Sequence, residues 1–119
     1  MMKRILPALA LGMMMVSSTA CFAEGAVAVG GDRYGMAYNQ HSGRAAEERA
    51  IEYCDHRDCH VVLRFDGECA SYASDERGAK GWAKGEREEH AERHAVEQCR
   101  EHSNHPGACE VRMTKCDQR

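Results

Sequence analysis

The sequence predicts an α+β fold in which an antiparallel sheet carries two helices packed on one face. Three observations predict it: a pattern that occurs twice along the chain, apolar residues that follow strand and helix periods in turn, and seven cysteines, of which the six from Cys54 onward can pair. The order of the elements predicts two pseudo-duplicated β-β-α-β units stapled by disulfides. One sheet covered by both helices would bury all the apolar stripes at once.

The first 23 residues have the features of a secretory signal peptide. Lys3 and Arg4 give a basic start, residues 5–16 are apolar, and residues 17–23 are mostly small. The apolar stretch is shorter than the ~20 residues needed to cross a bilayer. We therefore expect no transmembrane segment, and a secreted or periplasmic protein.

The cleavage site leaves two alternatives, after Ala20 or after Ala23. Cleavage after Ala23 removes Cys21 and leaves six cysteines, which suits a closed set of disulfides. Cleavage after Ala20 would place Cys21 at the new N-terminus, where a lipid could anchor it. Ser18 stands where a lipoprotein signal normally has leucine, so soluble export is favoured over the anchor.

The charge of the chain argues against two classes of partner. The whole sequence carries a net charge of −3, and loss of Lys3 and Arg4 with the leader makes it −5. Nucleic acids and anionic membranes both require a basic face, so we expect neither as the main partner. Few bulky apolar residues remain in the mature chain, and a domain of this size then needs covalent support.

The mature chain, residues 24–119, reads as a single domain made of two repeats, at about 25–68 and 69–117. Each repeat contains a helix whose small apolar residues recur every four positions. The two stripes coincide when the halves are aligned: Ala46, Ala50 and Cys54 in the first, and Ala91, Ala95 and Cys99 in the second. Ile51 and Val96 widen them, and Ser42 is suited to begin the first helix as its N-cap.

Strand-like alternation flanks both helices. The turn of the first hairpin is expected at Gly30-Gly31-Asp32, and Pro106-Gly107 prevents the second helix from continuing. The expected strands cover residues 26–29, 34–38, 59–65, 70–73, 81–84 and 109–114.

Six cysteines allow 15 pairings, and the sequence alone does not choose among them. The repeat favours one set, because each helix ends at a cysteine and each following strand begins at one. This set pairs Cys54 with Cys59, Cys99 with Cys109, and Cys69 with Cys116. A structural zinc site is disfavoured because the spacings are not the C-x2-C of zinc knuckles.

His90 and His94 lie one helical turn apart and could hold a metal ion as a weak site. The segment lacks the zinc-protease motif, since Ala91 stands where the catalytic glutamate belongs. A solvated helix face explains the same residues. Seven histidines also allow a metal- or pH-responsive envelope protein as an alternative function.

Three tyrosines are candidates for a binding surface. Tyr34, Tyr38 and Tyr72 lie on expected strands and could form an aromatic face on the uncovered side of the sheet. Core packing of these side chains is the other interpretation. The segment 102–108 is a second candidate for partner recognition.

No catalytic constellation is recognisable. There is no G-x-S-x-G turn and no phosphate-binding glycine loop, and the six mature cysteines are accounted for by pairing. We expect no cofactor. A small secreted hydrolase is the third hypothesis, after a binding protein and a metal- or pH-responsive one.

Several motifs together resemble a known bacterial exported family, "domain of unknown function 4189". They are the G-x-A strands at 35–37 and 81–83, the alanine-rich helices ending in cysteine, the C-x-V strands, and Cys69-Ala70. The resemblance implies a small secreted or periplasmic protein with no assigned activity, and it supplies no catalytic or ligand residues. We therefore expect a non-catalytic binding protein that recognises a protein or cell-envelope partner.

Overall fold

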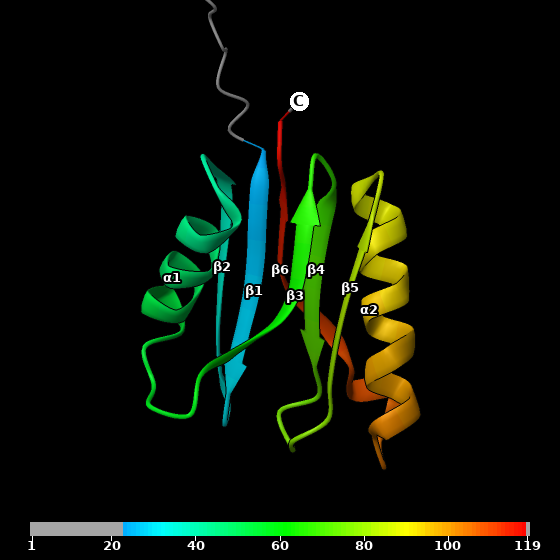
Figure 1. Ribbon diagram of the computed structural model, residues 1–119. Coiled ribbons are helices and arrows are strands. Elements are labelled where there is room, and N and C mark those ends of the chain that lie inside the picture. The colour runs from blue at the N-terminus through cyan, green and yellow to red at the C-terminus, as the bar shows by residue number, and fades with distance from the viewer. Residues whose placement is uncertain (1–22, 119) are drawn as a thin grey trace, which may run out of the picture.

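The computed structural model describes residues 23–118, so the expected leader and Cys21 lie outside the described residues, apart from Ala23. The β-β-α-β order predicted for each half is confirmed (Figure 1). The elements are β1 (Glu24–Gly30), β2 (Arg33–Gln40), α1 (Gly43–Cys54), β3 (His60–Asp66), β4 (Cys69–Ser74), β5 (Lys80–Gly85), α2 (Glu88–His102), the short 3-10 helix η1 (Pro106–Ala108) and β6 (Glu110–Cys116).

The strands form two antiparallel sheets of three strands each, in the orders β2-β1-β3 and β5-β4-β6. Figure 1 shows the sheets between the helices, with α1 outside the first sheet and α2 outside the second. The α+β class and the antiparallel pairing are confirmed. The arrangement of one sheet with both helices on the same face is wrong, because each half forms its own sheet and places its own helix on the outer face.

The residues of β1 explain why two sheets form. Ala26 and Ala28 face α1, while Val27 and Val29 face the second sheet, and all four are buried. A strand that is apolar on both faces must be covered on both. The valine face packs into a central core with residues of both sheets, including Met36, Phe65, Ala70, Tyr72 and Trp82.

Small residues let each helix lie close to its sheet. The alanine and cysteine stripes of both helices are buried, as expected. A Cβ added at Gly35 would stand 2.3 Å from the Ala50 carbonyl oxygen, and one at Gly81 would stand 2.1 Å from that of Ala95. The prediction that Ile51 widens the first stripe is wrong, since it is 41 % exposed.

Three disulfides join Cys54 to Cys59, Cys99 to Cys109 and Cys69 to Cys116. These are the pairs that the repeat favours. The last links β4 to β6 at facing positions, at the end of the sandwich where the chain terminates. Nearby, the buried Asp117 accepts a hydrogen bond of 2.6 Å from the Asn39 amide and so ties the two sheets together. None of the helices in the described part of the chain is long and apolar enough to cross a membrane.

Candidate functional site

A pocket of about 520 Å³ opens at the opposite end of the sandwich, between the β1–β2 and β4–β5 turns. We call it the end pocket. The first half contributes Gly31, Asp32 and Tyr34 to its lining. The second half contributes Tyr72, Ser74, Glu76, Gly78, Ala79, Lys80 and Arg112. A volume in this range is typical of small-molecule sites.

Two stacked tyrosines line the pocket. The rings of Tyr34, from β2, and Tyr72, from β4, lie with centroids 4.5 Å apart and planes 26° apart. Tyr72 is 1 % exposed, and burial raises the pKa of its phenol, so the hydroxyl stays protonated at neutral pH. The stack joins the two sheets and gives the pocket an apolar surface beside polar groups.

Arg112 is fixed at the edge of the pocket by β4. Its Nε donates to the Ser74 hydroxyl at 2.9 Å, and one terminal nitrogen donates to the Ser74 carbonyl at 3.0 Å. The guanidinium also pairs with Glu76 at 3.7 Å and with Glu110 at 3.4 Å. Its charge is therefore already compensated within the protein.

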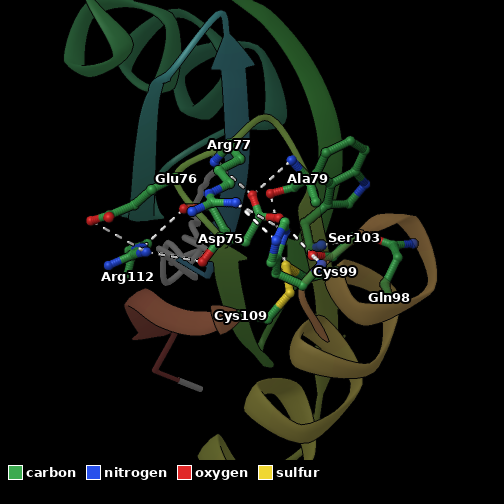
Figure 2. The surroundings of a disulfide bond; sticks show 12 residues. Asp75, Glu76, Arg77, Ala79, Gln98, Cys99, Ser103, Cys109 and Arg112 are labelled. Atoms are coloured by element: carbon green, nitrogen blue, oxygen red, sulfur yellow. Dashed lines mark hydrogen bonds and ion pairs between the residues drawn. A yellow bond between two sulfur atoms is a disulfide. The ribbon is translucent and has the colours of Figure 1, made fainter. Parts of the chain in front are cut away.

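The β4–β5 turn, residues 75–79, forms one wall of the pocket and is organised around Asp75 (Figure 2). One carboxylate oxygen of Asp75 accepts hydrogen bonds from the amides of Arg77 at 2.8 Å and Ala79 at 3.0 Å. The other accepts from the Ser103 hydroxyl at 2.6 Å. These bonds, led by that from Ser103, hold the pKa of the carboxyl below its usual range.

Ser103 connects this wall to a disulfide. It lies between Cys99 and Cys109, in the loop that their bond closes. A second contact joins the same two segments, since Arg77 places a guanidinium nitrogen 2.9 Å from the Nε2 of His105. Figure 2 shows Asp75 beside the disulfide, with Ser103 next to it. The disulfide loop therefore fixes the position of the pocket wall.

The chain belongs to a family of proteins without an assigned activity. The family model described as "Domain of unknown function (DUF4189)" matches residues 24–116, nearly all of the described part. This is a DUF4189 domain. No curated protein and no solved structure matches the chain.

The three tyrosines singled out in the DUF4189 sequence do not share an open face, because the two sheets cover each other's inner sides. Tyr34 and Tyr72 meet at the end pocket. Tyr38 is 38 % exposed and lies elsewhere, with the ammonium of Lys115 5.4 Å from its ring centroid.

His90 and His94 lie on α2, away from the residues that line the end pocket. Arg87 donates to the Nε2 of His90 at 3.2 Å, because a guanidinium can only donate. His94 lies 3.3 Å from a carboxylate oxygen of Glu97. Within residues 23–118, no group of three His, Cys, Asp or Glu side chains is placed to hold a metal ion.

The sequence interpretation missed the charged residues of the DUF4189 pocket. Asp32 lies in a turn, and Lys80 and Arg112 lie on strands. Charged residues at such positions are usually exposed to solvent, so their sequence context gave no sign of a pocket. One sequence feature could have indicated the pocket. The polar segment 74–78 makes the β4–β5 connection longer than the β1–β2 connection.

Proposed function

We propose that this protein is an exported, non-catalytic binding protein whose ligand occupies the end pocket. The observation that supports it most is the pocket itself: an apolar tyrosine stack bordered by a few charged groups and held in place by a disulfide loop. Pockets of this composition bind small ligands. Three disulfides in so small a domain favour an oxidising compartment, periplasmic or extracellular.

The lining also favours binding over catalysis. It includes no histidine or cysteine, and its serine hydroxyl, on Ser74, already accepts from Arg112. A serine nucleophile needs a base that takes its proton, whereas the recorded side-chain partners of the Ser74 hydroxyl are Arg112 and the Tyr72 phenol. The buried Tyr72 phenol has a raised pKa and is a hydrogen-bonding group at neutral pH.

A screen of small fragments against the ¹⁵N-labelled, disulfide-bonded protein tests this function. We expect hits to shift the amide signals of Tyr72, Ser74 and Ala79, and Tyr34→Ala to abolish those shifts. Tyr53→Ala is the matched control, because Tyr53 is 53 % exposed on α1 and does not line the pocket. Absence of hits at the pocket, or hits only along α2, would contradict the proposal.

A further inference from the structure

Building on the binding function proposed above, we infer that the end pocket takes a short peptide with free amino and carboxyl ends and an apolar side chain. Two charged residues carry the inference. Asp32 lies in the β1–β2 turn and Lys80 begins β5, so they belong to opposite sheets and line the same pocket. The side of the pocket formed by the first sheet, which we call the Asp32 lip, thus carries a negative charge. The opposite side, the Lys80 lip, carries the charge of Lys80 beside the ion pair of Arg112 and Glu76.

Among residues 23–118, neither Asp32 nor Lys80 has an ion-pair partner. Within the described residues, Arg112 is paired with Glu76 and Glu110, whereas no ion pair joins Asp32 or Lys80 to another side chain. A ligand of one sign would satisfy one lip and face a like charge on the other. A zwitterion satisfies both, with its ammonium at Asp32 and its carboxylate at Lys80.

The surface between Asp32 and Lys80 indicates the side chain and the size of the ligand. The stacked rings of Tyr34 and Tyr72 offer apolar area, which suits an apolar or aromatic side chain. The volume of about 520 Å³ is large for a single free amino acid and suits a di- or tripeptide.

Isothermal titration with the dipeptide L-leucyl-L-phenylalanine tests the inference. We expect binding that weakens about tenfold when either end is blocked, by N-acetylation or by C-terminal amidation, because each block removes one charge-assisted contact. Asp32→Asn should abolish the discrimination against the acetylated peptide alone. Lys80→Gln should abolish the discrimination against the amidated peptide alone.

Lys84→Gln and Asp66→Asn serve as matched controls, since both residues lie outside the pocket lining and should leave both discriminations intact. Equal binding of free and doubly blocked peptide would overturn the inference. So would failure of the free dipeptide to bind while fragments still shift the pocket amides, a result that leaves the proposed function standing. Failure of both peptides and fragments would overturn the two together.

Discussion

The two halves of the molecule share their element order, their alanine stripes and the glycine beneath each helix, and they differ at their connections. Two residues, Gly31 and Asp32, link β1 to β2, whereas five, residues 75–79, link β4 to β5. The connection that follows α2 is also longer and contains η1. Both additions lie at the same end and contact each other through Asp75 and Ser103. The parts that depart from the repeat are those that build the pocket wall.

The opposite end shows a second difference. In the first half, Arg64 of β3 pairs with Glu24 of β1 at 3.2 Å and with Glu47 of α1 at 3.0 Å. In the second half, the Cys69–Cys116 disulfide joins β4 to β6. At this end, ion pairs therefore add to the backbone pairing of the edge strand in the first half, and a disulfide adds to it in the second.

Removing disulfides should give the largest and most unequal effects. The double substitution Cys69→Ala/Cys116→Ala opens a loop with a sequence separation of 47, and we expect it to lower the free energy of unfolding by about 4 kcal/mol. Cys54→Ala/Cys59→Ala opens a separation of only 5 and should cost about 2 kcal/mol. Denaturant unfolding measures both, and equal losses would refute the loop-length explanation.

The shared glycines should respond alike in the two halves. Gly35→Ala and Gly81→Ala each drive a methyl group into the backbone of the overlying helix, and each should cost about 3 kcal/mol. Gly107→Ala is the control, because nothing lies within 4 Å of its added Cβ, and its effect should stay within about 0.5 kcal/mol. A loss in only one half, seen by thermal unfolding, would show that the two helices do not pack equivalently.

Much of the fold could be predicted because it follows from local patterns. Helix and strand periods, the two alanine stripes and the cysteine positions are all visible in the sequence. The layer arrangement could not be predicted in the same way, because the strand periods do not show whether the six strands form one sheet or two. Burial of both faces of residues 26–29 by a helix and a second sheet is visible only in the structure. The pocket could not be predicted, because Asp32 and Lys80 come together only through the packing of two sheets.

The carboxyl groups at the two ends should give pH effects of opposite sign. The pKa of Asp75 is lowered, so its ionised form stabilises the fold above the unfolded pKa, and this contribution is lost as the pH falls through the folded pKa. The pKa of Asp117 is raised, chiefly by burial, so its ionisation costs stability as the pH rises through the folded value.

Unfolding of the wild type, Asp75→Asn and Asp117→Asn between pH 3 and 7 measures this difference. The advantage of the wild type over Asp75→Asn should shrink as the pH falls. The stability of the wild type relative to Asp117→Asn should instead increase as the pH falls. Parallel curves for the two variants would contradict the assigned directions.

A smaller, local effect is expected at Ser103. Ser103→Ala removes the hydroxyl that donates to Asp75 at 2.6 Å while leaving the Cys99–Cys109 disulfide intact. We expect faster hydrogen exchange at the amides of Arg77 and Ala79, with the Tyr72 amide unchanged. Asn104→Ala, at the exposed neighbouring position, is the control and should change neither. Unaltered exchange in Ser103→Ala would mean that the disulfide loop does not hold the pocket wall.

The most direct test replaces residues 75–79 with the Gly-Asp turn of the first half and repeats the fragment titration. The fold should persist, with all three disulfides present by mass spectrometry and a cooperative thermal transition. We expect every pocket-directed fragment to lose its binding, since the second half would then lack the wall that distinguishes it from the first. A folded variant that still binds the same fragments, with the same amide shifts, would contradict the role given to this turn.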